Sequence, residues 1–230
     1  MESKKISIFL PIEIKTRELL AKVILSNFII SNKKKNTRCY IGSKSSIDRL
    51  LSIKKTNSGI FLYKGGLSIN KLKKIREKVE KFLILDEEIG PASINLEKDM
   101  PIRLWDGSEK YIDRYYTIGK DVDNLARKFL PKLKNKIILT GWPRIDLWKK
   151  EFRHIYKNST ENIRKKYGKF ILFSSDFGYN SQTRIHDIEN QFKKSEWKIL
   201  QDILPDEMNW AKNVFLEFKK TIKMMQDLDE

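Results

Sequence analysis

Three consecutive acidic residues, Asp86, Glu87 and Glu88, form the densest group of carboxylates in the sequence. They follow residues 82–85 (FLIL), an apolar run with the length and composition of a buried strand. Carboxylates this close raise one another's pKa, which makes one of them a usable proton donor near neutral pH. We therefore expect acid/base chemistry on a sugar hydroxyl or glycosidic oxygen. The alternative is a helix N-terminus, where acidic side chains balance the helix dipole.

A fourth carboxylate, Glu13, follows another predicted strand, residues 6–12 (ISIFLPI). The carboxyl ends of parallel strands share one edge of a sheet, so Glu13 is expected to face the same crevice as the acidic triplet. It either contacts substrate or caps the helix that begins near Thr16. The neighbouring Arg17 and Glu18 are interpreted as surface charges of that helix.

Residues 136–148 (KIILTGWPRIDLW) pass from a short apolar strand into a loop and then a helix. Gly141 permits a positive φ and Pro143 fixes φ, so we expect a stiff loop at the end of a central strand. Arg144 could clamp an anion there, and Asp146 could orient a hydroxyl. The alternative is that these two side chains only brace the turn.

A second polar loop, SSDFGYNS, follows the apolar residues 170–173 (FILF). Ser175, Asp176 and Gly178 are candidate substrate-binding residues, because a loop between a strand and a helix can present backbone N–H groups to a phosphate. The alternative is an ordinary turn between the two elements.

Metal and cofactor signatures are missing from the sequence. His154 and His186 do not have metal-ligand spacing to other candidate ligands, and Cys39 is the single cysteine. The glycine-rich nucleotide motifs and the common hydrolase motifs are also absent; Gly65-Gly66 lacks a third glycine. We expect no metal and no bound cofactor.

The composition of the 230-residue chain, 40% hydrophobic and 11% aromatic, indicates a folded protein. No apolar stretch reaches the length of a transmembrane helix and no secretory signal is evident, so we expect a cytoplasmic protein. The net charge of +17 suggests a polyanion partner, but the excess of lysine over arginine is typical of an AT-rich genome. Nucleic-acid binding is therefore the least favoured function.

The alternation of apolar strands with helices predicts an α/β fold with a doubly wound parallel sheet. The expected strands are residues 6–12, 37–42, 59–63, 82–85, 115–118 and 136–139, and the expected helices begin at Thr16 and span 45–53, 70–81 and 121–129. On the first helix, Leu19, Leu20, Val23, Ile24, Phe28 and Ile29 are expected to face the sheet. Residues 89–113 are expected to be irregular.

The remaining chain is predicted to contain a helix over 147–167, with Trp148, Phe152, Ile155 and Tyr156 facing inward. A strand at 170–173 and two helices, 189–204 and 206–228, are expected to follow. The predicted organisation is a Rossmann-like domain at 1–148, a linker helix at 149–168, and an incomplete second domain at 169–230.

The segments IFLPIEIKTREL, LILDEEIG, KIILTGWPRIDLW and YGKFILFSSDFGYNS together resemble the bacterial surface carbohydrate (lipopolysaccharide) biosynthesis protein family, which has the GT-B glycosyltransferase architecture. The resemblance covers most of residues 5–181. The family's central motif is similar to TGNPRFD; here Trp142 replaces Asn and Ile145 replaces Phe.

This resemblance implies two Rossmann-like domains with a nucleotide sugar as donor substrate in the cleft, and a glycan or lipid-linked acceptor. It also implies a cytoplasmic location with peripheral contact to the inner membrane. The His-Pro and Arg-Gly segments with which the family grips the nucleotide do not occur after Asn180. We therefore expect a truncated or split form, or a second chain that supplies the missing domain. The alternative is a non-enzymatic module that binds a glycan or a partner through the apolar stripe at 206–228.

Overall fold

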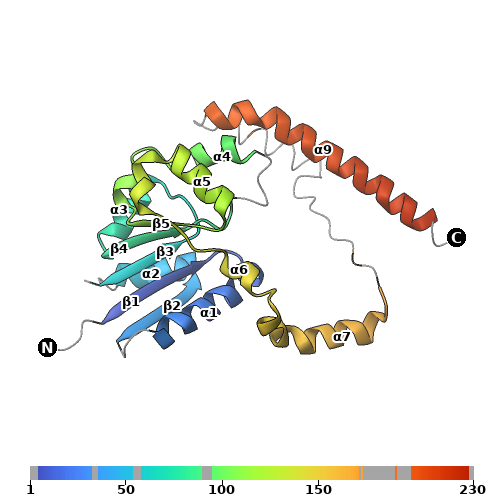
Figure 1. Ribbon diagram of the computed structural model, residues 1–230, viewed down its shortest axis with the longest axis horizontal. Helices are drawn as coiled ribbons and strands as arrows, with labels where there is room; N and C mark the ends of the chain where they lie inside the picture. Colours follow the sequence, from blue (N-terminus) through green and yellow to red (C-terminus); the bar gives the residue numbers. More distant parts are fainter. Residues whose placement is uncertain are drawn as a thin grey trace. The chain divides into compact units, whose positions relative to one another are not determined.

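The structure, a computed structural model, describes residues 5–32, 36–53, 58–89, 95–170, 172, 190 and 198–227. The chain divides into two units, Met1–Glu161 and Asn162–Glu230, which we describe separately. The first unit contains a six-stranded, all-parallel sheet flanked by helices (Figure 1). It is a doubly wound α/β fold of the Rossmann-like class, as the sequence predicts.

The described strands match the predicted ones to within one or two residues. They are β1 (Ile6–Ile12), β2 (Thr37–Ser43), β3 (Gly59–Tyr63), β4 (Lys81–Leu85), β5 (Arg114–Thr117) and β6 (Ile137–Leu139). Their order in the sheet is β2-β1-β3-β4-β5-β6, and every neighbouring pair is parallel. β1, β3 and β4 are short, largely buried apolar runs, as expected of central strands, whereas β2 and β6 at the two edges are more exposed.

The helices of the first unit follow the strands in alternation. They are α1 (Lys15–Asn32), α2 (Lys44–Ile53), α3 (Ile69–Arg76), α4 (Leu96–Ile102), α5 (Lys120–Phe129) and α6 (Pro143–Asp146), with α7 (Lys157–Tyr167) at the boundary between the units. Three 3-10 helices, η1 (Ser108–Tyr111), η2 (Pro131–Lys136) and η3 (Lys150–Tyr156), complete the set. The expected irregular segment therefore contains α4 and η1. Asn95 begins α4 because its side chain accepts hydrogen bonds from two backbone N–H groups of the first turn.

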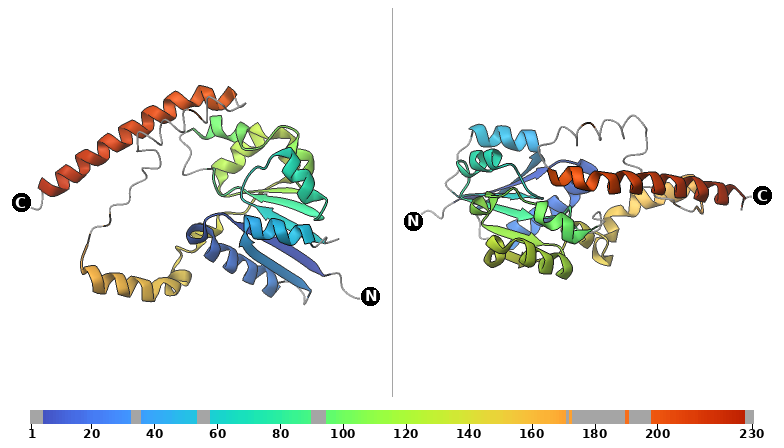
Figure 2. Two further views of the ribbon diagram at one scale, coloured as in Figure 1. Left: turned by 180° about the vertical axis from the view of Figure 1, so that it is seen from behind. Right: turned by 90° about the horizontal axis from the view of Figure 1, so that it is seen from above.

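The strand order determines which face each helix covers. The chain moves from β1 outward to β2, and then crosses back over β1 to β3 and onward to β6. Because parallel crossovers are right-handed, α1 lies on one face of the sheet and α2, α3 and α5 lie on the other (Figure 2). The reversal of direction between β1 and β3 is the topological switch point of the sheet.

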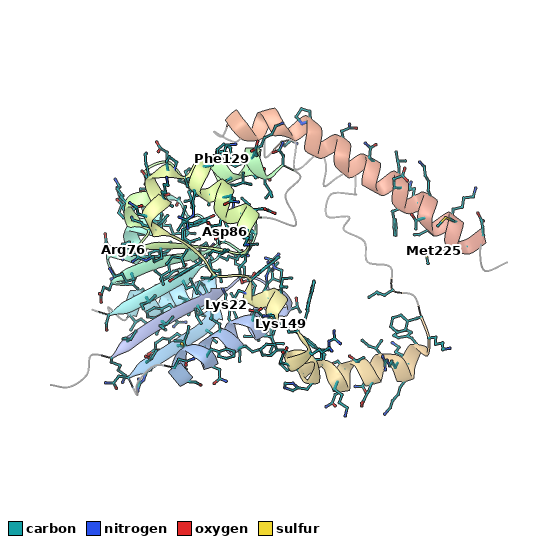
Figure 3. The ribbon with its side chains drawn as sticks, viewed as in Figure 1. Lys22, Arg76, Asp86, Phe129, Lys149 and Met225 are labelled. Atoms are coloured by element: carbon teal, nitrogen blue, oxygen red, sulfur yellow. The ribbon has the colours of Figure 1, made fainter. Side chains whose placement is uncertain are left out.

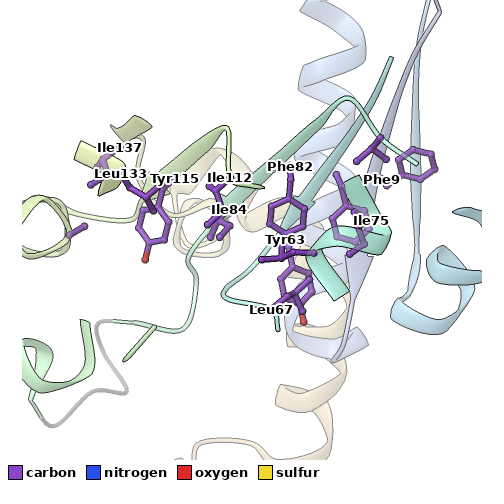
Figure 4. Close-up of a cluster of buried hydrophobic side chains, with 14 of the residues drawn as sticks. Phe9, Tyr63, Leu67, Ile75, Phe82, Ile84, Ile112, Tyr115, Leu133 and Ile137 are labelled. Carbon is purple, nitrogen blue, oxygen red and sulfur yellow. The ribbon is translucent and has the colours of Figure 1, made fainter. Parts of the chain in front are cut away.

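Two apolar clusters pack on the two faces. The larger joins α2, α3, α4 and α5 to the sheet through buried residues such as Phe9, Phe61 and Phe82 (Figure 4). The smaller lies under α1 and includes Ile8 and Leu10. Side chains alternate between the two clusters along β1, which is the periodicity of a strand.

The buried face of α1 differs from the prediction. Val23 and Phe28, which were expected to face the sheet, are 44% and 57% exposed. The buried residues are instead Glu18, Ala21, Lys22 and Ser26. The apolar residues of α1 occur on all sides of the helix, so their spacing does not define one buried face. The two buried charges, Glu18 and Lys22, are stabilised by ion pairs described below.

The segment after β6 also differs from the prediction. Instead of a single helix over 147–167 the structure has η3 and α7, because Lys149 has extended backbone geometry, and the short α6 precedes them, because Pro143 starts a helix immediately after Trp142. Leu147 is buried, whereas Trp148 is 72% exposed and does not face inward. Gly168, with a φ of 65°, ends α7 as expected.

In the second unit, α9 (Lys198–Asp227) is a single helix. Two helices separated at Pro205 were predicted, and this prediction is wrong, because α9 continues through Pro205. A proline removes one hydrogen bond of a helix without necessarily ending it. The predicted strand at 170–173 falls largely outside the described residues. None of the described helices is long and apolar enough to span a bilayer.

The loop after β3 packs closely against the segment after α4. A Cβ atom at Gly66 would collide with the carbonyl oxygen of Arg103, and one at Gly65 would lie 3.1 Å from its guanidinium. The two glycines therefore allow Arg103 to approach the end of β3.

We expect Gly66→Ala to lower the free energy of unfolding by about 1–3 kcal/mol, the usual cost of overpacking. Gly42→Ala is the control, because its added methyl would make only ordinary contacts with Ser46 and Ile47. Urea unfolding of both variants measures the difference. Equal stabilities would contradict the close packing at Gly66.

Candidate functional site

Charged side chains from three strand ends meet at the switch point of the sheet. Glu13 follows β1, Lys64 follows β3, and Asp86, Glu87 and Glu88 follow β4. The ladder between β1 and β3 pairs only Ser7 to Phe9, whereas β1 pairs with β2 as far as Ile12. The carboxyl ends of β1 and β3 therefore lie beside each other without ladder pairing, which leaves room for side chains between them.

The ammonium group of Lys64 is at the centre of this cluster. Its Nζ lies 2.7 Å from Glu88 Oε1, 2.9 Å from Glu13 Oε2 and 3.0 Å from Glu18 Oε1. The Lys64 side chain is only 6% exposed. An ammonium has three N–H donors, so the three carboxylates match its full hydrogen-bonding capacity. Lys64 thereby connects the ends of β1, β3 and β4 with helix α1.

Glu13 has further donors around it. The Tyr63 hydroxyl donates to Glu13 Oε1 at 2.6 Å, and Lys44 Nζ donates to the same oxygen at 3.1 Å. Lys44 also donates to the Tyr63 hydroxyl oxygen at 2.7 Å. The Glu13 backbone N–H donates to Glu18 Oε2 at 3.0 Å, which holds the first turn after β1 against α1.

Asp86 is fully buried and accepts hydrogen bonds from Arg103, from Tyr115 and from the Glu88 backbone N–H, the last at 3.2 Å. Arg103 Nε and Nη2 donate to its two oxygens at 2.9 and 2.6 Å, and the Tyr115 hydroxyl donates to Oδ2 at 2.7 Å. Tyr63 and Tyr115 belong to the larger apolar cluster, and Figure 4 shows their hydroxyl groups at its margin. This bidentate arrangement is strong and specific in geometry, so Asp86 is committed to structure.

Glu87 and Lys22 form a second buried pair. Lys22 Nζ lies 3.4 Å from Glu87 Oε2, and both side chains are at most 2% exposed. Figure 3 labels Lys22, which comes from α1, and Asp86, which follows β4. The Arg144 Nη2 atom donates to the Glu87 carbonyl oxygen at 2.6 Å, and the Arg144 guanidinium lies over the Trp142 ring, 4.6 Å from its centroid.

The surroundings shift several pKa values. Burial alone would raise the pKa of Glu13, but hydrogen bonds from Tyr63, Lys64 and Lys44 lower it to about 2. The pKa of Glu18 is also lowered, since the Glu13 N–H and Lys64 outweigh its burial. Burial would lower the pKa of Lys64, but its three carboxylate partners raise it. Glu13, Glu18 and Lys64 are therefore charged at neutral pH.

The structure brings together most of the residues that the sequence singles out. Glu13, the acidic triplet and Arg144 all belong to this cluster. Gly141 has a φ of 99°, as its place after β6 suggests. Asp146 does not join the cluster, because it is 48% exposed and pairs with Lys149 at 2.6 Å. Ser175, Asp176 and Gly178 lie outside the described residues.

Several members of the cluster were not predicted. The sequence interpretation treats Glu18 as a surface charge, yet its side chain is 1% exposed. The spacing of Glu18 and Lys22 with Leu25 and Ile29 is a signal, since residues three and four apart share one face of a helix. Lys64, directly after a buried strand, is a second signal. Arg103 has no signal, because the sequence does not reveal that α4 precedes it.

The cluster is unsuited to a metal ion, because ammonium and guanidinium groups already occupy its carboxylates. Among the described residues there is no group of three or more potential metal ligands. Arg17 also belongs to the cluster, because its Nη2 lies 3.1 Å from Glu18 Oε1 and 3.5 Å from Glu88 Oε1. The exposed members are Glu88, Glu13, Lys44 and Arg17, with 39%, 34%, 33% and 41% of their side chains exposed. Side by side they offer both acceptors and donors to a polar ligand.

The fold and this cluster define a doubly wound parallel α/β protein with a polar site at its switch point. Comparison of the sequence and structure with protein-family models, with curated proteins and with solved structures finds no match.

We expect Lys64→Met to lower the free energy of unfolding by about 3–5 kcal/mol, because it leaves three carboxylates facing one another without a cation. The matched control is Lys132→Met. Lys132 also bridges two carboxylates, Asp106 and Glu109, but it is 65% exposed. Its replacement should leave the stability nearly unchanged, since exposed pairs contribute little. Urea unfolding at neutral pH checks both, and similar losses would contradict the central role of Lys64.

The stability conferred by Glu13 should depend on pH. Its folded pKa of about 2 lies below the ordinary value of 4.5, so its contribution is present above pH 4.5 and is lost as the pH falls towards 2. The difference in unfolding free energy between the natural protein and Glu13→Gln should therefore shrink over this interval. Glu161→Gln, on the exposed surface of α7, should show no such convergence. A constant difference for Glu13→Gln would argue against the shifted pKa.

Proposed function

We propose that the first unit binds carbohydrate at the carboxyl edge of its sheet, as part of a glycosyltransferase-like protein of bacterial surface polysaccharide synthesis. The observation that carries the proposal is the convergence of Glu13, Lys64 and Glu88 from three strand ends at the switch point. Ligands of open α/β sheets bind at this place. Sugar hydroxyls both donate and accept hydrogen bonds, and neighbouring carboxylates and ammonium groups complement them.

The sequence resemblance supports the same proposal. Three of its segments contain β1, β4 and β6 with the residues that follow them, and these strands all end at the edge where the cluster lies. In this interpretation the donor is a nucleotide sugar and the acceptor is a glycan or a lipid-linked saccharide. A lipid-linked acceptor would bring the protein to the cytoplasmic face of the inner membrane.

Among the four predicted carboxylates, we assign the acid/base role to Glu88. Its side chain is 39% exposed, whereas Asp86 and Glu87 are buried and paired with Arg103 and Lys22. Glu13 is accessible, but a carboxylate with a pKa of about 2 is a weak proton acceptor. Glu88 would accept the proton of the acceptor hydroxyl while that oxygen bonds to the anomeric carbon and the nucleoside diphosphate leaves.

The test is a binding screen of the full chain with UDP-glucose, UDP-galactose, UDP-N-acetylglucosamine, GDP-mannose, dTDP-rhamnose and the corresponding free sugars. Isothermal titration calorimetry should detect at least one ligand. Glu88→Gln should weaken its binding by about tenfold or more, because hydrogen bonds to charged groups contribute about 1.5–3 kcal/mol.

The control for this screen is Glu151→Gln, which replaces the carboxylate of an exposed residue in η3 by a carboxamide. It should bind the same ligand with unchanged affinity. Absence of binding by every member of the panel would refute the proposed function. Equal affinities for Glu88→Gln and the natural protein would refute the assignment of Glu88.

A further inference from the structure

Three buried polar atoms near helix α6 have no hydrogen-bond partner within the part of the chain that the structure describes. They are Glu87 Oε1, Trp142 Nε1 and Arg144 Nε. Buried polar groups are nearly always paired, so unpaired atoms require an explanation. Because these three unpaired atoms lie on residues that contact one another, we look for one explanation for all three.

Printed contacts connect these residues to one another. Arg144 donates through Nη2 to the Glu87 carbonyl oxygen at 2.6 Å, and its guanidinium stacks on the Trp142 ring. Lys22 occupies the other carboxylate oxygen of Glu87 and neutralises its charge. The helix that carries Lys22, α1, packs against α6. The unpaired atoms therefore belong to one region between α1, α6 and the residues after β4.

The chemistry of the three atoms identifies the group that would satisfy them. Trp142 Nε1 and Arg144 Nε are donors, and Glu87 Oε1 is an acceptor. A hydroxyl has two acceptor lone pairs and one donor, so a single hydroxyl can satisfy all three. A deprotonated anion has no hydrogen to donate to Glu87 Oε1, and a cation could not accept from the two N–H groups.

The three atoms are sealed from solvent, so a ligand can reach them only if the Trp142–Arg144 turn moves. The residue before this turn, Gly141, has a φ of 99°, and no atom lies within 4 Å of where its Cβ would be. A glycine in open space tolerates a change of backbone angles. The Arg144 hydrogen bond described above joins the turn to the segment after β4.

We propose that the turn formed by Trp142, Pro143 and Arg144 opens at Gly141 and closes over one hydroxyl of a sugar ligand. This hydroxyl donates a hydrogen bond to Glu87 Oε1 and accepts hydrogen bonds from Trp142 Nε1–H and Arg144 Nε–H. This proposal rests on the proposed function and specifies how that site recognises its sugar. It gives Trp142 a role in ligand selection, because only a ligand with a hydroxyl in this position satisfies all three atoms.

The test uses Trp142→Phe in the full chain, which retains an aromatic ring for Arg144 and removes the pyrrole ring of the indole together with its N–H. Because this N–H has no partner among the described residues, any loss of stability should be limited to the packing lost with that ring. The substitution should weaken the binding of the panel's tightest-binding ligand by about tenfold. Among mono-deoxy analogues of that sugar, one should bind equally weakly to the natural protein and to Trp142→Phe. Trp148→Phe, which alters a 72% exposed ring, is the matched control and should change neither property.

A second readout separates this inference from the proposed function. In ¹⁵N-labelled protein, the Trp142 indole signal, identified by its loss in Trp142→Phe, should shift when the sugar is added. Sugar binding without this shift, or with unchanged affinity for Trp142→Phe, would overturn the inference and leave the proposed function intact. Absence of sugar binding would overturn both.

Discussion

The ion pairing of Lys64 is the interaction on which the organisation of the sheet edge depends. Its ammonium connects Glu13, Glu18 and Glu88, which come from the end of β1, from α1 and from the end of β4. Removing an ammonium group from water is costly unless its donors are satisfied, and here each N–H has a carboxylate. The same three carboxylates would repel one another without it. The position of each therefore depends on Lys64.

Two buried ion pairs support the cluster of charges around Lys64. Asp86 with Arg103 and Glu87 with Lys22 are buried and engaged, so they position the segment after β4 and leave Glu88 at the accessible edge. The acidic triplet thus has three different environments within three residues. Sequence proximity alone suggests that the carboxylates share a proton, whereas the structure gives each one its own cation.

The sequence predicts the sheet well because most of its strands are short, mainly apolar runs bounded by turn residues. It also predicts that Glu13 and the acidic triplet gather at one edge, since parallel strands end there. The apolar residues of α1 do not define its buried face, because they occur on all sides of the helix. The positions of Lys22 and Lys64 are signals, but they are two of 47 basic residues, and the tertiary contacts are what distinguish them from surface lysines.

The switch point also has a consequence for how the chain folds. Tyr63 and Glu13, which meet there, are 50 residues apart in the sequence, whereas β4, β5 and β6 each join a strand that precedes them directly. Closing so long a loop costs conformational entropy before any contact compensates for it. The edge that gathers the charges is therefore expected to be among the last parts of the sheet to consolidate, and its non-local pairing should limit the folding rate.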